Sequence, residues 1–389
     1  MPEKFDPFEA TIESIGAAYA AGTATCVELA GYYLDRIAKF DRNGPEINSI
    51  ITISPTVLED AAELDRTYAE TGPVGPLHGV PVLVKDQVDV VGMPTTLGSV
   101  LLRDHYPDSD GVVVRKLEEA GALILAKTTL GELAGFDSED PSTAWGVGQM
   151  KGTFVSHPDA NALAGARIGI IREIIGLGSD PAAADFARSR TVFDTAIGEL
   201  ASAGAQIVDP LTIENLLPLL AERAFDSGKE AFESWMGRNA DPPYRSHEDF
   251  VAEEQYRKAM WLRGGGRPSP WQATYEEYLA ARDDLRTNML VAMAEHELDA
   301  IVHITVEHTP TLITDGVNAP YVNMKGAPHI NTFLYDVPSM TVPAGFTEDE
   351  LPVGITFLGR PYSDQRIVSL AYAYEQATAH RVPPASTPA

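Results

Sequence analysis

The sequence predicts an α/β protein in which helices connect mainly parallel strands. The apolar run 80–84 is bounded by Gly and Pro, and the run 122–126 follows Gly121, as is typical of buried strands. These runs alternate with stretches of helical periodicity, which favours parallel pairing and right-handed crossovers. The chain has 389 residues, 44% of them hydrophobic and 22% charged, and large α/β sheets reach this size as one unit.

Local signals define the elements of the first third of the chain. Gly22 is a C-terminal helix stop, and Thr25 and Glu28 form a capping box that opens the next helix. The elements expected here are helices over 11–20, 25–41, 57–69 and 111–119, strands over 48–53, 80–85 and 122–126, and a helix that opens at Lys127-Thr128-Thr129.

The rhythm of strands and helices breaks over residues 135–165, which are rich in acidic residues, Gly, Ser and Pro and predict an irregular surface connection. The Pro-rich C-terminal tail is expected to be disordered at its end. Between them we expect strands over 166–171, 205–208, 298–305, 339–342 and 353–358, helices opening at Asp180-Pro181 and at Ser363, and a mostly helical stretch over 212–298.

Charge and composition exclude several classes of function. The formal net charge of −27 and the sequence pI of about 4.6 disfavour nucleic-acid and anionic membrane partners. Cys26 is the only cysteine, so an internal disulfide or a thiolate metal cluster cannot form. The sequence has no apolar run of membrane-spanning length and no visible secretory signal, and we expect a cytoplasmic protein.

Lys85 is the first candidate for a functional residue, because it ends the apolar strand 80–84. An ammonium group at the end of a buried strand is costly unless it is used or paired. In open α/β sheets chemistry occurs at the carboxyl ends of strands, which favours a working lysine. The alternative is an ion pair with Asp86 or with another carboxylate at the sheet edge.

Other candidates are weaker. The chain has no Gly-x-Ser-x-Gly elbow and no His-Glu-x-x-His motif. Two groups could be drawn as metal sites, but their spacing matches no standard ligand set, so we expect no metal and no cofactor. The two groups are His303 with Glu307 and His308, and His105 with Asp108 and Asp110. His78 is interpreted as a structural residue of a turn.

Several long motifs resemble the amidase signature family. The first is Gly-Pro-Leu-His-Gly-Val-Pro-Val-Leu-Val-Lys-Asp over residues 75–86, and Gly-Met-Pro-Thr-Thr-Leu-Gly-Ser follows over 92–99. The similarity continues over 110–134, and the stretches 331–346 and 351–361 resemble the closing motif of the family. The resemblance covers nearly the whole chain.

The resemblance implies a large mixed β-sheet flanked by helices on both faces. It also implies a serine hydrolase that cleaves carboxylic amides through an acyl-serine intermediate, with a nucleophilic serine, a bridging serine and a lysine. Lys85 matches that lysine by motif and position. A lysine can act as a base only if desolvation or positive neighbours lower its pKa.

The chain departs from the family pattern at one place. The Gly/Ser-rich core that would carry both serines and the oxyanion-hole donors is absent, and Ala134 runs directly into Gly135. We expect none of Ser138, Ser142 and Ser156 to be the nucleophile, because they lack flanking glycines. The sheet should therefore be incomplete at its centre. A gene model or isoform lacking a segment, a natural pseudoenzyme and a poorly folding remnant remain alternative explanations.

The prediction is a single amidase-like domain over residues 1–389 with a deletion junction near 134–135. Lys85 is the one catalytic residue expected to survive. The reaction implied is hydrolysis of a small-molecule amide, with turnover absent or very low in this chain. The alternative is a non-catalytic small-molecule-binding or interaction protein on the same scaffold. No nucleic-acid or membrane partner is expected, and the oligomeric state is left open.

Overall fold

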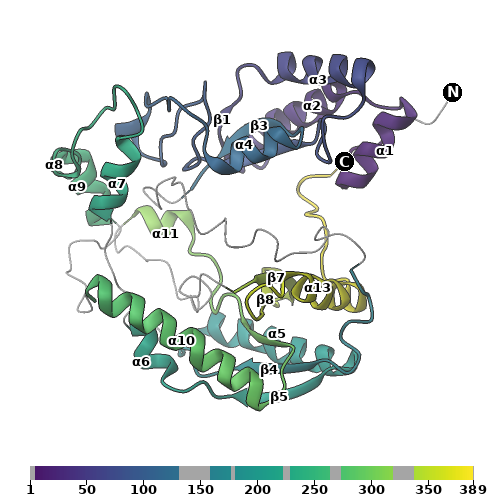
Figure 1. Ribbon diagram of the computed structural model, residues 1–389, viewed down its shortest axis with the longest axis vertical. Coiled ribbons are helices and arrows are strands. Elements are labelled where there is room, and N and C mark those ends of the chain that lie inside the picture. Colours follow the sequence, from purple (N-terminus) through teal and green to yellow (C-terminus); the bar gives the residue numbers. More distant parts are fainter. Residues whose placement is uncertain are drawn as a thin grey trace. The chain divides into compact units, whose positions relative to one another are not determined.

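The structure is a computed structural model that describes residues 5–130, 158–176, 180–221, 228–262, 273–318 and 337–388. The chain divides into two compact units (Figure 1). Unit 1 comprises Met1–Asp140, Ser227–Met260 and Pro383–Ala389, and unit 2 comprises Pro141–Asp226 and Trp261–Val382. Each unit contains a mixed sheet covered by helices, which confirms the predicted α/β class. The strands are divided between two sheets, and the organisation as a single domain stays a prediction.

The sheet of unit 1 has three strands in the order β1-β3-β2. The strands are β1 (Ile50–Ile53), β2 (Pro81–Lys85) and β3 (Leu123–Thr128); β2 is parallel to β3 and β1 is antiparallel to it. The helices of unit 1 are α1 (Ile12–Ala21), α2 (Cys26–Arg36), α3 (Val57–Thr71), α4 (Val112–Glu119), α7 (Gly228–Met236), α8 (His247–Ala252) and the start of α9 (Glu254–Leu262). A π-helical turn, η1 (Ile37–Asp41), continues α2, and a 3-10 turn, η2 (Val100–Leu102), precedes α4.

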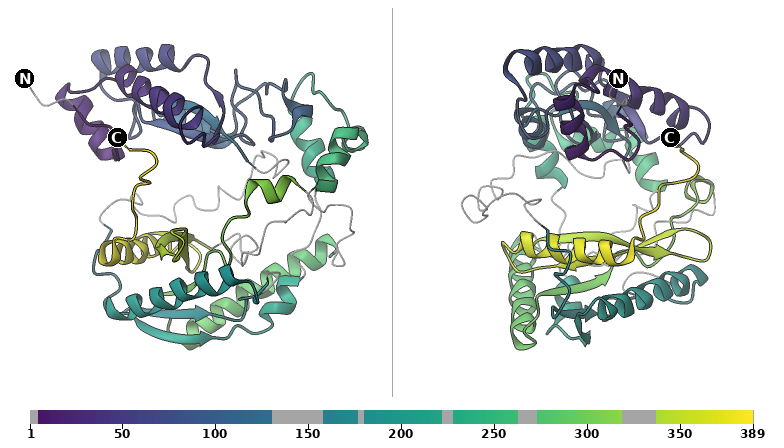
Figure 2. Two further views of the ribbon diagram at one scale, coloured as in Figure 1. Left: turned by 180° about the vertical axis from the view of Figure 1, so that it is seen from behind. Right: turned by 90° about the vertical axis from the view of Figure 1, so that its right-hand side faces the viewer.

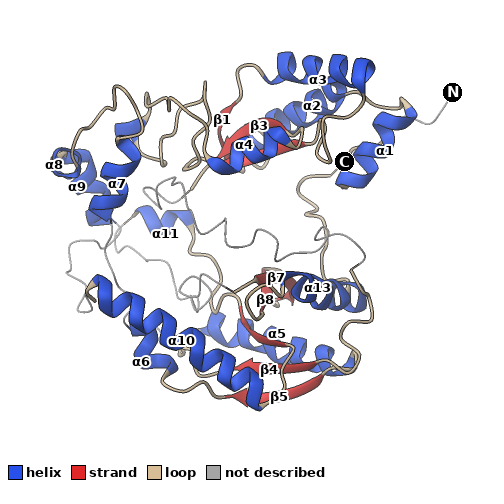
Figure 3. Cartoon of the chain, in the orientation of Figure 1, coloured by secondary structure: helices blue, strands red, loops and turns tan. Residues whose placement is uncertain are grey.

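Both faces of this sheet are covered, because side chains alternate along β3. Leu123 and Leu125 pack with α1, α2 and α3, while Ile124 packs against Val114 of α4 (Figure 3). The predicted caps are present: Thr25 and Glu28 form a reciprocal capping box, and Gly22 closes α1 in the left-handed conformation.

The sheet of unit 2 has five strands in the order β5-β4-β6-β8-β7. Strands β4 (Arg167–Ile171), β5 (Gln206–Leu211) and β6 (Ala300–Ile304) are parallel, whereas β8 (Pro352–Leu358) is antiparallel to both β6 and β7 (Ser339–Phe346). The helices are α5 (Ala184–Ser202), α6 (Leu216–Ala221), α10 (Tyr275–Glu295), α11 (Ile313–Val317) and α13 (Asp364–Thr378).

Two hydrophobic clusters cover opposite faces of this sheet. Helices α5 and α13 pack on the face that carries Ile168 and Val302, and α6 and α10 pack on the face that carries Ile301. The yellow helix α13 lies along β7 and β8 in both views of Figure 2. Neighbouring residues of β6 thus enter different clusters, as the two-residue period of a strand requires.

Three local predictions were wrong. Lys127 and Thr128 belong to β3, because the parallel pairing with β2 extends to Thr128, and a helix beyond residue 130 lies outside the described residues. Helix α5 begins at Ala184, and the Asp180 carboxylate instead accepts a hydrogen bond from the Ala182 amide in a preceding turn. The C-terminal tail is ordered to residue 388, because Arg36 donates hydrogen bonds to its carbonyl oxygens. Most of the predicted irregular connection, including Ser138, Ser142 and Ser156, lies outside the described residues.

Candidate active site at the carboxyl ends of two strands

The candidate site lies where the parallel strands β2 and β3 end together. Val84 is paired with Lys127 and Lys85 with Thr128. The Asp86 amide donates a hydrogen bond of 3.0 Å to the Thr128 carbonyl oxygen, which carries the pairing one residue further. The carboxyl ends of parallel strands are the usual place for binding and catalysis in α/β proteins.

Asp86 is fully buried, and its carboxylate holds the loop that follows β2. It accepts hydrogen bonds from the Thr96 hydroxyl at 2.5 Å, the Gly98 amide at 3.1 Å and the Thr96 amide at 3.3 Å. One carboxylate thus fixes the motif over residues 92–99 against the end of the sheet.

Lys127 supplies the counter-charge. Its ammonium is fully buried and lies 3.4 Å from the Asp86 carboxylate. It also donates hydrogen bonds to the Pro94 carbonyl oxygen at 2.9 Å and to the Thr95 hydroxyl at 2.8 Å. A buried charge is tolerated only with such partners, so the pair belongs to the architecture of this site.

The sequence prediction missed Lys127 as a site residue, although the same signal that identified Lys85 was present. Each lysine follows an apolar strand run, and the two strands are neighbours in the sheet. The Thr-Thr pair after Lys127 suggested a helix start and concealed this similarity.

Lys85 differs from Lys127, because its side chain is exposed. It shares a face of β2 with Leu83, which is 47% exposed. The expected burial of its ammonium is therefore not found. Asp86 pairs with Lys127, and no ion pair of Lys85 occurs within the described parts of the chain. A catalytic role for Lys85 stays a prediction.

His105 borders the buried pair. Its ring packs edge-on against Trp235 with 5.1 Å between ring centroids. Burial, and then the nearby Lys127 charge, lower the pKa of His105, so that the neutral imidazole is favoured. Asp108 and Asp110, the other members of this possible metal group, accept hydrogen bonds from the Ala240 and Val91 amides.

His78 has the structural role that was predicted for it. Its Nδ1 accepts a hydrogen bond of 3.1 Å from the Val74 amide across the turn. Its Nε2 lies 3.9 Å from the Cys26 thiol, and burial raises the pKa of that thiol to about 12. Cys26 is therefore protonated at neutral pH and does not form a reactive thiolate.

The second possible metal group does not converge either. In unit 2, His303 Nδ1 lies 2.7 Å from the Ile304 carbonyl oxygen, His308 lies 3.2 Å from the Asp185 carboxylate, and Glu307 accepts from the Gly176 amide. Among the residues that the structure describes, no group of three or more His, Cys, Asp or Glu side chains could hold a metal ion.

The same described residues contain no helix that is both long enough and apolar enough to cross a lipid bilayer.

Comparisons with known proteins agree with the motifs. The model of the family named Amidase matches residues 28–147 and 137–368. One protein of the glutamyl-tRNA(Gln) amidotransferase from Symbiobacterium thermophilum is 23% identical over 482 positions, which cover 93% of this chain and 95% of that protein. Its counterpart from Methanosarcina barkeri is 40% identical over 115 positions, or 30% of this chain and 22% of that protein.

Solved structures share the fold. The native peptide amidase from Stenotrophomonas maltophilia matches with a TM-score of 0.76 at 24% identity, covering 97% of this chain and 99% of that one. An amidase family protein from Bacillus anthracis matches with a TM-score of 0.71 at 18% identity, covering 96% and 92%. The family match extends over most of the sequence and includes the strand that ends at Lys85. The chain therefore belongs to the amidase family, whose signature its motifs carry.

Proposed function

We propose that this chain is an amidase-family protein that holds a small carboxylic amide near Lys85, with turnover absent or very low. The family reaction is hydrolysis of the amide C–N bond. The observation that carries the proposal is the lack of a Gly/Ser-rich nucleophile segment anywhere in the sequence. Without an activated serine and oxyanion-hole donors, the rate should fall by roughly a million-fold.

Two further observations support a missing segment near residues 134–135. The family match divides into two pieces that meet at residues 137–147. The alignment with the Symbiobacterium thermophilum protein spans 482 positions, more than the 389 residues of this chain, so that relative has residues without a counterpart here. The serines nearest this junction are Ser138, Ser142 and Ser156.

The test of inactivity is labelling of the purified full chain with a fluorophosphonate probe, which reacts with activated serines. Intact-protein mass spectrometry should detect no adduct. A stoichiometric serine adduct that disappears in Lys85→Ala would refute the proposal. Lys116→Ala is the matched control, because Lys116 is an exposed lysine on α4.

The second candidate function is binding without cleavage. It is favoured by the exposed Lys85 ammonium, which has no ion pair among the described residues and can donate to the carbonyl oxygen of an amide. Titration with phenylacetamide, followed by calorimetry, should give saturable binding that Lys85→Ala weakens and Lys116→Ala does not. Equal binding by all three proteins would argue against this role for Lys85.

A thermal melt of each protein is needed alongside both tests. A cooperative transition with a sizeable enthalpy distinguishes a folded protein from a poorly folding remnant. A variant that fails to melt cooperatively is replaced by Lys85→Met, which retains the length of the side chain without its charge.

A further inference from the structure

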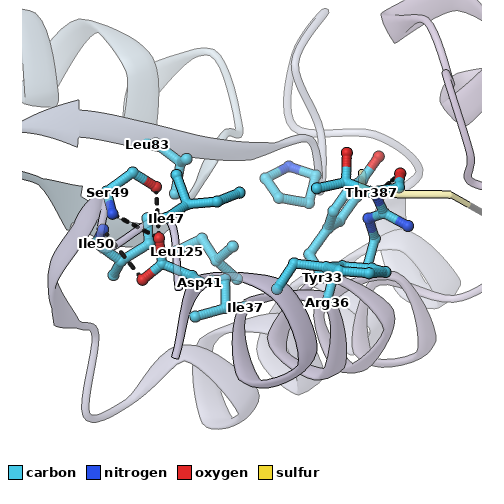
Figure 4. Close-up of a pocket in the computed structure, with 12 residues that line it drawn as sticks. Tyr33, Arg36, Ile37, Asp41, Ile47, Ser49, Ile50, Leu83, Leu125 and Thr387 are labelled. Carbon is cyan, nitrogen blue, oxygen red and sulfur yellow. Dashed lines mark hydrogen bonds between the residues drawn. The ribbon is translucent and has the colours of Figure 1, made fainter. Parts of the chain in front are cut away.

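A pocket of about 400 Å³ in unit 1 is separate from the buried Lys127–Asp86 pair. It lies between the end of α2, the turn η1, the sheet and the C-terminal tail, and the residues labelled in Figure 4 line it. Its wall is largely apolar and includes Ile37, Phe40, Ile47, Leu83 and Leu125. This volume is within the range of small-molecule sites.

Of the described residues that line the pocket, only Arg36 is cationic. Its guanidinium carbon lies 4.9 Å from the centroid of the Phe40 ring, 5.4 Å from that of Phe8 and 5.8 Å from that of Tyr32. No ion pair of Arg36 with a carboxylate occurs in the described residues. Aromatic faces hold a guanidinium in place and leave its N–H groups available for a planar acceptor.

The acceptors that Arg36 has found are two carbonyl oxygens of the tail. One terminal nitrogen donates to Pro388 at 2.8 Å and the other donates to Thr387 at 3.0 Å. Two hydrogen bonds from the two terminal nitrogens are also the arrangement in which arginine binds a carboxylate. A carboxylate carries a full charge, so its hydrogen bonds to Arg36 would be stronger than those of neutral carbonyl groups.

The tail is held loosely. Residues 381–386 and 388 are exposed, and Thr387 is half-buried. The other hydrogen bonds of Thr387 return to Pro384 within the tail itself. A ligand that binds Arg36 therefore has to displace only a short exposed segment.

Asp41 restricts the charge that the pocket can accept. Its carboxylate accepts hydrogen bonds from the Ser49 amide at 2.6 Å, the Ser49 hydroxyl at 2.7 Å and the Ile50 amide at 3.3 Å. Figure 4 shows this group away from Arg36 and Thr387, beside Ser49 and Ile50. Because Asp41 is a buried anion, a second acidic group on a ligand would be repelled.

The geometry points to a binding site for a small monocarboxylate with an apolar body, in which Arg36 binds the carboxylate and the C-terminal tail competes with it. The apolar body would lie against Leu83, Leu125 and the end of α2. The site does not depend on the proposed amide binding, because it uses neither Lys85 nor a serine. The π-helical turn that forms part of its wall is a feature often found at functional sites.

The test is calorimetric titration of the full chain with 4-phenylbutanoate and with 4-phenylbutanamide, its neutral analogue. The carboxylate should bind about tenfold more tightly than the amide, and Arg36→Gln should abolish this preference. Arg66→Gln, which removes an exposed arginine on α3 outside the pocket, should leave binding unchanged. Deletion of residues 383–389 should strengthen binding by about threefold or more, because the competitor is removed.

The inference is overturned if the carboxylate and the amide bind equally, if Arg36→Gln retains the preference, or if neither the full nor the shortened chain binds the carboxylate. Unchanged affinity after the deletion would overturn competition by the tail. Cooperative thermal unfolding of each variant is required first. If Arg36→Gln fails to fold, Arg36→Lys replaces it, and it should weaken carboxylate binding because lysine lacks the planar fork.

Discussion

Replacement of Lys127 by methionine is the sharpest test of the buried pair. The substitution keeps the length of the side chain and removes its charge. Asp86 would remain fully buried without its counter-ion, and the Pro94 carbonyl oxygen and the Thr95 hydroxyl would lose a donor. Each buried polar group left unpaired costs about 1–3 kcal/mol. Breaking a buried ion pair by removing one partner costs about 3–5 kcal/mol, and the two estimates agree.

The assay is equilibrium unfolding in urea followed by circular dichroism. With a slope of about 3 kcal/mol per M, Lys127→Met should lower the midpoint by about 1 to 2 M. In Lys127→Met/Asp86→Asn the unpaired charge is removed while an acceptor for Thr96 and Gly98 is retained. The double variant should therefore be more stable than Lys127→Met alone.

Lys116→Met is the matched control, since Lys116 is exposed on α4, and it should change stability by no more than about 0.5 kcal/mol. The reasoning fails if Lys127→Met lowers stability by less than about 1 kcal/mol. It also fails if the double variant is no more stable than the single one, because the buried charge would then not be the source of the loss.

Two further predictions concern buried residues of each unit. Burial lowers the pKa of His303 to about 4, so its contribution to stability is complete above the unfolded pKa of about 6.5 and is lost as the pH falls towards 4. Between pH 7 and pH 5 the free energy of unfolding should fall by roughly 2 kcal/mol more than in His303→Leu, measured by urea unfolding; parallel pH dependences would contradict this. Gly79→Ala should be destabilising by about 2 kcal/mol or more in the same assay, because Gly79 has φ +66° and a new Cβ would lie against Cys26 and Tyr19. Gly16→Ala in α1, where nothing lies within 4 Å, should instead stabilise by about 0.5–1 kcal/mol, and equal effects of the two substitutions would refute the packing argument.

Local signals in the sequence predicted much of the fold. The capping box of Thr25 and Glu28 and the left-handed Gly22 act within a few residues, and the structure has both. The assignment failed where tertiary pairing overrode a local signal. Lys127-Thr128-Thr129 has the composition of a helix start, but its pairing with β2 keeps Lys127 and Thr128 in a strand.

The candidate site was only partly predictable for the same reason. Lys85 could be found because it ends an apolar run and lies in a long family motif. That Asp86 pairs with Lys127 depends on two strands becoming neighbours, which no single stretch of sequence states. The contact between Arg36 and Thr387 joins residues 351 positions apart, and nothing near either residue indicates it.

The composition of unit 1 also determines when it can be completed during synthesis. The unit takes residues from the beginning, the middle and the end of the chain. Trp235, in the middle stretch, donates a hydrogen bond to Asp89, and the tail supplies the acceptors for Arg36. Domains tend to fold from the N-terminus as the chain leaves the ribosome. Unit 1 cannot follow that order to its end, so a nascent chain has an open Arg36 pocket until its last residues are released.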